Sequence, residues 1–240
     1  MEELRATRVP PVGPWQVATV VGVHQETTNA KTFRLDVPGP HDFVAGQHFI
    51  VRLTAPDGYS AQRAYSAASA PGHEPFEITV ELLPGGEVSE FLHESLTDGD
   101  TVELRGPIGG HFAWDVSGPI LGVAGGGGVV PLMSMRRAAR AAGREELMHL
   151  AVSVRSPADL YYADEVVGPH TTVVYSRASP PGHPRPVGRL TEDDLAPLIT
   201  GGQVAFVCGN PAFCDAATML LDGLGFPAHD IRVERFGPSG

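Results

Sequence analysis

The pattern of apolar residues changes near residue 115, and this change limits the folds that the chain can adopt. Before it, short β-like segments alternate with turn sequences: WQVATVVGV, KTFRLDV, HFIVRLT, RAYSAAS, FEITVELL and TVELRG. After it, apolar strand segments alternate with helical ones, beginning at PILGVAG and ending at DIRVERF. The first pattern predicts a six-stranded antiparallel barrel. The second predicts a parallel-sheet α/β domain.

We therefore expect a flexible arm at residues 1–13, a β-barrel domain at 14–114 and an α/β domain at 115–240. One short helix is expected in VSEFLHESL within the barrel half. In the second half, helices are expected in ADLYYADEVV, EDDLAPL and AFCDAATMLLDGLG. Each follows residues that favour a helix start. These are Ser156-Pro157, Thr191 with Asp194, and Asn210-Pro211.

Composition excludes several classes of protein. The net charge of −11 argues against nonspecific nucleic-acid binding. No run of about 18 apolar residues is present, so no membrane span is expected, and the N-terminal residues lack a signal-peptide core. Cys208 and Cys214 cannot build a disulfide framework or a four-cysteine metal site, and the ten histidines show no metal-ligand spacing. We expect a cytoplasmic protein with no metal, nucleic-acid or membrane partner.

Four consecutive glycines, Gly125–Gly128, lie between the first strand and the first helix predicted in the second half. Parallel sheets bind phosphates there, because glycine lets a ligand approach the backbone and the helix N-terminus offers unpaired N–H groups. A GxGxxG motif would place its last glycine on Pro131, so the sequence fits GxGxxP on Gly126, Gly128 and Pro131. A flexible strand-to-helix turn is the alternative interpretation of this motif alone.

The barrel half contains two further candidate binding segments. In RAYSAAS, Arg63 can bind a phosphate, Tyr65 can lie against a flat ring and Ser66 can hydrogen-bond a ring nitrogen. Arg63 and Tyr65 share one face of a strand, and Ser66 faces the other unless the strand bends. An edge strand with ordinary polar residues is the alternative. In PGGEVSEFL, Gly85-Gly86 precede a helix with Ser89 in its first turn, which favours an anion site.

Several short motifs follow one another along the chain: RxYS, GGxxS, GPIG, GxGxxP and CGNP. This ordered set resembles the ferredoxin–NADP reductase superfamily, which includes oxygenase reductases, flavin reductases and the reductase portion of flavohaemoglobins. The resemblance covers about residues 14–237. It implies that the barrel binds FAD and that the α/β domain binds NAD(P).

The resemblance also implies roles for the barrel residues. Arg63 would hold the FAD pyrophosphate, Tyr65 would pack on the isoalloxazine ring and Ser66 would reach flavin N5. The GGxxS segment would bind the diphosphate, and Phe236 would cover the flavin ring. The implied FAD contacts are Arg63, Ala64, Tyr65, Ser66, Gly86, Val88, Ser89 and Phe236.

For the nucleotide, the resemblance places the NAD(P)H pyrophosphate on the glycine loop. The implied catalytic residues are Ser66, Cys208 near the nicotinamide, and Glu234 near the hydride path. The Ser176-Arg177 pair resembles the pair that grips the 2′-phosphate in NADP-specific relatives, so we expect NADPH, with NADH possible. The implied nucleotide contacts are Gly126, Gly127, Gly128, Pro131, Arg155, Ser176, Arg177, Gly209 and Pro211.

Two departures from the family pattern affect the expected function. Relatives often carry threonine or serine at the position of Gly127, so one hydroxyl contact to the nucleotide is expected to be missing here. The two cysteines cannot ligate a plant-type iron–sulfur cluster. The resemblance therefore implies an FAD-dependent NAD(P)H reductase that passes single electrons to a separate acceptor, such as a ferredoxin, a flavodoxin or an oxygenase component.

Two other functions remain open at this point. One is a flavin reductase that uses diffusible flavin, and the other is a non-catalytic flavin redox sensor. A basic cluster follows the glycines, and it is interpreted as a solvated helix face or, alternatively, as a docking patch for an acidic partner. It comprises Arg136, Arg137, Arg140 and Arg144.

Overall fold

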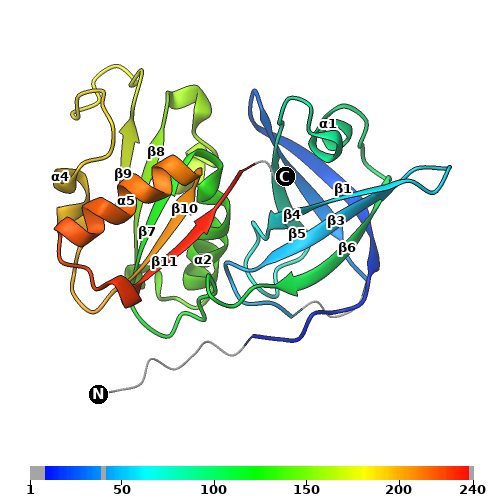
Figure 1. Cartoon of the computed structure of the whole chain (residues 1–240), viewed down its shortest axis with the longest axis horizontal. Helices are drawn as coiled ribbons and strands as arrows, with labels where there is room; N and C mark the ends of the chain where they lie inside the picture. The colour runs from blue at the N-terminus through cyan, green and yellow to red at the C-terminus, as the bar shows by residue number, and fades with distance from the viewer. Residues whose placement is uncertain (1–8, 39–41, 238–240) are drawn as a thin grey trace.

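The computed structural model describes residues 9–38 and 42–237. Figure 1 shows two units side by side, one built on each of two sheets. Residues 1–8 of the predicted arm lie outside the described residues, and residues 9–15 contain no helix or strand. Gly13 N donates to Gly106 O at 3.0 Å, so this part of the arm lies along the barrel. No helix in the described ranges is long and apolar enough to cross a membrane.

The first sheet contains six antiparallel strands in the order β4-β3-β6-β1-β2-β5, which confirms the predicted barrel half. An isolated bridge between Ala67 and Ile78 joins the ends of the two outer strands, so the sheet curls toward closure. The strands are β1 (Gln16–Thr27), β2 (Ala30–Asp36), β3 (His48–Thr54), β4 (Ser60–Ser66), β5 (Phe76–Glu81) and β6 (Thr101–Ile108).

Three phenylalanines form the centre of the barrel core. Phe49 and Phe76 pack with ring centroids 4.6 Å apart, and Phe33 is fully buried beside the same cluster. Edge-to-face packing of this kind stabilises a core beyond the area that it buries. The short helix α1 (Glu87–Glu94) closes one side by inserting Val88 and Leu92. The helix predicted in VSEFLHESL is confirmed.

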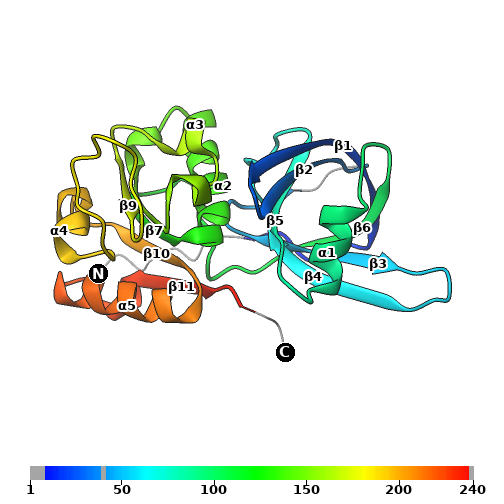
Figure 2. The same cartoon turned by 90° about the horizontal axis from the view of Figure 1, so that it is seen from above.

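The second sheet has five parallel strands in the order β11-β10-β7-β8-β9, as the alternating pattern predicts. Helix α2 (Val129–Ala141) covers one face and α5 (Pro211–Gly223) covers the other (Figure 2). Two short helices are α3 (Ala163–Val166) and α4 (Glu192–Leu195). The strands are β7 (Ile120–Gly125), β8 (Met148–Val154), β9 (Thr171–Tyr175), β10 (Val204–Gly209) and β11 (Ile231–Arg235).

Side-chain caps start two helices as predicted, and a third prediction was wrong in part. Asn210 accepts a 2.9 Å hydrogen bond from Phe213 N, and Thr191 forms a capping box with Asp194. The segment ADLYYADEVV is not one helix, because Tyr162 has a left-handed φ of 54°. Its buried hydroxyl bonds Thr79 of β5 at 2.5 Å, so contact with the barrel outweighs local helix preference.

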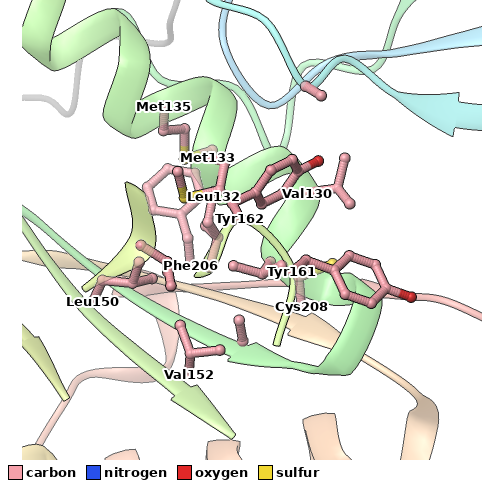
Figure 3. Close-up of a cluster of buried hydrophobic side chains, with 14 of the residues drawn as sticks. Val130, Leu132, Met133, Met135, Leu150, Val152, Tyr161, Tyr162, Phe206 and Cys208 are labelled. Atoms are coloured by element: carbon pink, nitrogen blue, oxygen red, sulfur yellow. The ribbon is translucent and has the colours of Figure 1, made fainter. Parts of the chain in front are cut away.

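One hydrophobic cluster joins the two units. It combines barrel-side residues such as Ala68 and Phe112 with residues of the second sheet and α2. The rings of Phe112 and Phe206 pack edge to face at 5.2 Å, and Arg232 Nη1 donates to Ala113 O at 3.0 Å. Figure 3 shows the part of this cluster built by α2, β8, β10 and the two adjacent tyrosines. The two sheets are therefore held at a dry, packed boundary. The predicted domain limits at 114 and 115 fall between β6 and β7.

Candidate active site

Ser66, at the end of β4, is a buried polar residue without a protein partner. Its exposed fraction is 5%, and no hydrogen-bond partner for its Oγ lies in the described part of the chain. A buried hydroxyl that lacks a partner costs free energy, so its presence points to a ligand atom. A flavin ring nitrogen fits this hydroxyl. The strand therefore fits the cofactor that its sequence implies.

The neighbouring side chains of β4 face a different way from Ser66. Tyr65 lies opposite Phe49 in the β3–β4 ladder and packs against the barrel core, and burial raises the pKa of its phenol to about 12. Arg63, two residues earlier, is exposed and donates to Gln62 O at 2.8 Å. The exposed Ala64 separates them. Strand β4 therefore carries the exposed guanidinium of Arg63, the neutral ring of Tyr65 and the buried hydroxyl of Ser66.

The turn before α1 uses the hydroxyl of Ser89 for its own structure. Ser89 Oγ accepts from Leu83 N at 3.2 Å and donates to Gly86 O at 2.9 Å. A β carbon on Gly86 would lie 2.6 Å from this hydroxyl, so the close turn requires glycine. The groups that the turn offers a phosphate are the N–H groups of the first helical turn, beginning near Val88. Direct contact between Ser89 and a diphosphate stays a prediction.

Each of the four glycines has a separate structural reason. Gly126 has a φ of 54°, a conformation that favours glycine. A β carbon on Gly128 would lie 2.1 Å from the Cys208 carbonyl oxygen, and one on Gly125 would lie 2.5 Å from the Phe213 ring. These two glycines therefore allow the turn to pack on β10 and α5. Gly127 differs, because the space beside its α carbon borders polar side chains.

The glycine turn leads directly into α2. Residues Gly126–Gly128 form one 3-10 turn, and Pro131 is buried in the first turn of the helix. Proline fits there because the first N–H groups of a helix have no partner within it. The turn thus presents backbone N–H groups at the carboxyl end of β7, which is the position at which parallel sheets bind phosphates.

Cys208 and Glu234 lie opposite each other in the β10–β11 ladder. Cys208 is fully buried, and burial raises the pKa of its thiol well above the usual range, so the thiol is neutral. Burial also raises the pKa of Glu234, to about 7. Phe236 N donates to Gly209 O at 2.8 Å, which extends the chain past the end of β10. Pro211 is the exposed first residue of α5.

Glu234 also lines a pocket of about 140 Å³ between the two units. His48 lines the same pocket, and the His48 side chain projects from the same face of the barrel sheet as Ser66, its partner in the β3–β4 ladder. Burial lowers the pKa of His48, so its ring is neutral at pH 7. The pocket is lined by Gly46, His48, Gly109, Gly110, His111, Phe112, Val233 and Glu234.

The sequence interpretation missed His48. His48 lies beside Ser66 only because of the register between β3 and β4, and no short sequence motif includes it. Among the residues that the structure describes, no group of three or more histidines, cysteines or carboxylates is placed to hold a metal ion.

The carboxyl ends of β8 and β9 lie side by side. Arg177 N donates to Arg155 O at 2.9 Å, and both arginine side chains are exposed. Ser176 N donates to Val154 O at 2.8 Å. These strand ends contain no acidic residue, but folding places Glu81 of β5 close enough to Arg155 for their charges to interact. The charge at this edge is therefore mixed.

The four arginines that follow the glycines do not form one solvated face. That interpretation was wrong for Arg136 and Arg137, which are buried or half-buried, whereas Arg140 and Arg144 are exposed. Arg136 is 6% exposed, and its Nη1 donates to Val166 O at 2.6 Å. Arg137 is bound to carboxylates of both units. Arg140 pairs with Glu145 and Glu165, and Arg144 donates to Val116 O. Tertiary contacts therefore hold Arg136 and Arg137, and a docking patch at the exposed Arg140 and Arg144 stays a prediction.

The chain is similar to known proteins across nearly its whole length. The family described as oxidoreductase FAD-binding domain matches residues 17–114. The ferredoxin–NAD(P)+ reductase component of a naphthalene 1,2-dioxygenase/salicylate 5-hydroxylase system from Ralstonia sp. is 31% identical over 232 residues, which cover 92% of this chain and 69% of that protein. A naphthalene 1,2-dioxygenase system reductase component from Pseudomonas putida is 29% identical, with the same coverage.

Solved structures show the same fold. A ferredoxin NADP+ reductase from Neisseria gonorrhoeae, determined with bound FAD and NADP, has a TM-score of 0.80 at 21% identity and covers 93% of this chain and 99% of its own. The cytochrome P450 reductase GcoB from Amycolatopsis has a TM-score of 0.79 at 26% identity, with 95% of this chain and 71% of its own covered. The chain belongs to the ferredoxin–NADP reductase superfamily of FAD- and NAD(P)H-dependent oxidoreductases.

Proposed function

We propose that this protein is an FAD-dependent NAD(P)H reductase that supplies single electrons to a separate protein, either a ferredoxin or an oxygenase component. The similar proteins from Ralstonia and Pseudomonas are reductase components of dioxygenase systems. Bound FAD would supply the chemistry, because it accepts a hydride from nicotinamide and releases electrons one at a time. A cytoplasmic location stays a prediction from composition.

The observation that carries the proposal is the buried hydroxyl of Ser66, which has no hydrogen-bond partner within residues 9–38 and 42–237. In the proposed site it donates to a flavin ring nitrogen. Arg63 and the turn at Gly86 bind the diphosphate, and Tyr65 lies against the ring system. Phe236, held by Gly209 at the end of β10, covers the opposite side and excludes water.

The nucleotide half of the site follows from the second sheet. The turn at Gly126–Gly128 binds the dinucleotide pyrophosphate through backbone N–H groups. The neutral thiol of Cys208 borders the nicotinamide, and Glu234 holds or releases a proton near neutral pH because its pKa is about 7. Arg177 and Ser176 bind the 2′-phosphate, which makes NADPH the proposed donor and NADH the weaker alternative.

Purification tests the proposal directly. A flavin-binding reductase is isolated yellow, and NADPH added without oxygen bleaches it. A colourless protein that reduces free flavin would instead be a flavin reductase. A yellow protein that no nicotinamide nucleotide bleaches would be a redox sensor.

Electron transfer to a partner is a separate measurement. The bleached protein should reduce an added ferredoxin in one-electron steps, with a rate that depends on ferredoxin concentration. Failure across a panel of ferredoxins and oxygenase components would contradict the proposed class of acceptor, even if the protein is yellow and bleached.

A further inference from the structure

A carboxylate from the barrel reaches the glycine turn of the other unit. Glu81 is the last residue of β5, and its Oε2 lies 3.0 Å from the position of a β carbon on Gly127. The Tyr161 hydroxyl lies 3.6 Å from the same position and is hydrogen-bonded to the Glu81 carboxylate. Two oxygen atoms from different parts of the chain thus border the space where a side chain at 127 would project.

Tyr161 is fixed, and Glu81 remains open to a ligand. The Tyr161 side chain is 5% exposed and joins the hydrophobic cluster between the units, and its hydroxyl points away from that cluster (Figure 3). Burial and the nearby Glu81 raise the pKa of this phenol, so it stays a donor. Glu81 as a residue is exposed, although packing around its carboxyl raises its pKa. The fixed hydroxyl of Tyr161 therefore donates to the Glu81 carboxylate and aligns it, while Glu81 remains accessible to a ligand.

The donors and acceptors around the turn match different parts of a dinucleotide. The turn N–H groups and the Arg155 guanidinium donate, so they match phosphate oxygens. An ionised carboxylate only accepts, so it matches a hydroxyl group and repels a phosphate. A ribose lies on either side of the pyrophosphate. In NADP(H) the nicotinamide ribose has two free hydroxyl groups, and the adenosine ribose has one beside its 2′-phosphate. A carboxylate beside a pyrophosphate-binding turn is thus placed to meet a ribose.

We propose that Glu81, aligned by Tyr161, is a specificity-determining residue that accepts hydrogen bonds from the ribose hydroxyl groups of the bound dinucleotide. It supplies, from the barrel, the polar contact that a glycine at 127 cannot make. The inference rests on the proposed function, since it assumes that a nicotinamide dinucleotide binds at Gly126–Gly128. It also explains how a turn of four glycines distinguishes a nucleotide from a simple phosphate compound.

Calorimetric titration of the FAD-loaded protein tests this role without turnover. The ligands are NADP+, nicotinamide mononucleotide, adenosine 2′,5′-bisphosphate and inorganic pyrophosphate, which lacks hydroxyl groups. The variants are Glu81→Ala, Glu81→Gln and Tyr161→Phe, and Glu94→Ala is the matched control on the exposed side of α1. Loss of a hydrogen bond to a charged group corresponds to about a tenfold or greater weakening.

Glu81→Ala should raise the Kd of NADP+ about tenfold and leave pyrophosphate binding equal or tighter. Glu81→Gln should raise the Kd of NADP+ by less than Glu81→Ala does, and Tyr161→Phe should raise it about threefold. Glu94→Ala should leave this Kd unchanged. The ligand half that shows the same loss, nicotinamide mononucleotide or adenosine 2′,5′-bisphosphate, identifies the ribose. Tighter binding of NADP+ and pyrophosphate alike in Glu81→Ala would overturn the inference, because Glu81 would then only repel phosphate. Unchanged binding of every ligand would also overturn it.

A rescue experiment adds a second criterion. Gly127→Ser in the Glu81→Ala background places a hydroxyl in the space that the carboxylate leaves, and NADP+ affinity should recover at least threefold. No recovery would contradict the idea that Glu81 replaces a turn hydroxyl. If the unaltered protein binds neither NADP+ nor NAD+, the proposed function itself fails. If the unaltered protein binds NADP+ and the Glu81 variants bind it equally well, only the role of Glu81 fails.

Discussion

The Arg137 guanidinium joins the two units of the protein, with Nη1 2.8 Å from Glu77 Oε2 on β5 and Nη2 2.6 Å from Glu165 Oε2 in α3. These three side chains are mostly buried, and Arg137 Nη1 also donates to Ala68 O at 2.9 Å. The nearby carboxylates raise the pKa of Arg137, although burial opposes them. A cation shared by two units couples their folding.

Arg137→Met should therefore lower the free energy of unfolding by about 2–3 kcal/mol, because two carboxylates and a carbonyl lose a charged donor. Calorimetry should show the single unfolding transition splitting into two. Arg144→Met is the control, since Arg144 is exposed and makes one hydrogen bond, to Val116 O. Equal losses in the two variants would contradict a coupling role for Arg137.

Ser66→Ala separates a structural role from a cofactor role. Because Ser66 Oγ lacks a partner among the described residues, the FAD-free variant should be as stable as the unaltered protein, or more stable by about 1 kcal/mol. Reduction of bound flavin by NADPH should slow at least tenfold. Ser134→Ala is the control, since Ser134 Oγ donates to Ser69 O at 2.7 Å and its loss costs about 1 kcal/mol. Normal flavin reduction in Ser66→Ala would exclude Ser66 from the flavin site.

Glu234 makes stability depend on pH. Its pKa is about 7 when folded and about 4.5 when unfolded, so the folded state binds more protons between these values. Stability should fall as the pH rises from about 4.5 to 7, by up to about 3 kcal/mol. Glu234→Gln removes this ionisation, so the free energy of unfolding of the variant should match that of the unaltered protein near pH 4.5 and exceed it at pH 8. Denaturation at both pH values measures this, and a constant difference would show that Glu234 is not the titrating group.

Arg177→Ala tests the preference for NADPH. An arginine–phosphate contact worth about 1.5–3 kcal/mol corresponds to about a 10- to 150-fold preference in kcat/KM. Arg177→Ala should remove most of this preference and leave NADH turnover nearly unchanged. Arg155→Ala should change it less, because the charge of Arg155 already interacts with that of Glu81. If the unaltered protein uses both nucleotides equally, Arg177 does not bind a phosphate.

Arg63→Ala tests the diphosphate site of FAD. The exposed guanidinium makes one hydrogen bond, to Gln62 O, so its removal should leave the fold intact. FAD affinity should weaken by about 1.5–3 kcal/mol per lost charge-assisted hydrogen bond, while riboflavin affinity should not change. Fluorescence titration with both flavins gives the comparison. Equal affinities of the unaltered protein for FAD and riboflavin would show that no pyrophosphate site is present.

Local sequence determined the elements and their order. Short β-like segments separated by turn residues predicted the barrel strands, and the apolar run ILGVAG predicted the first strand of the parallel sheet. Caps at Asn210 and Thr191 set helix starts because they act on the backbone a few residues away. The motif around Ser66 and the glycine turn were also visible, since their residues lie close together in the chain.

Tertiary structure alone decided which distant residues meet. Strand register placed His48 opposite Ser66, and packing of the two units brought Glu81 to Gly127. The same packing placed Arg137 of α2, predicted to lie on a surface face, in half-buried ion pairs with Glu77 and Glu165. Sequence patterns report periodicity and short-range chemistry, whereas these contacts depend on side chains that approach only after both sheets have formed and packed.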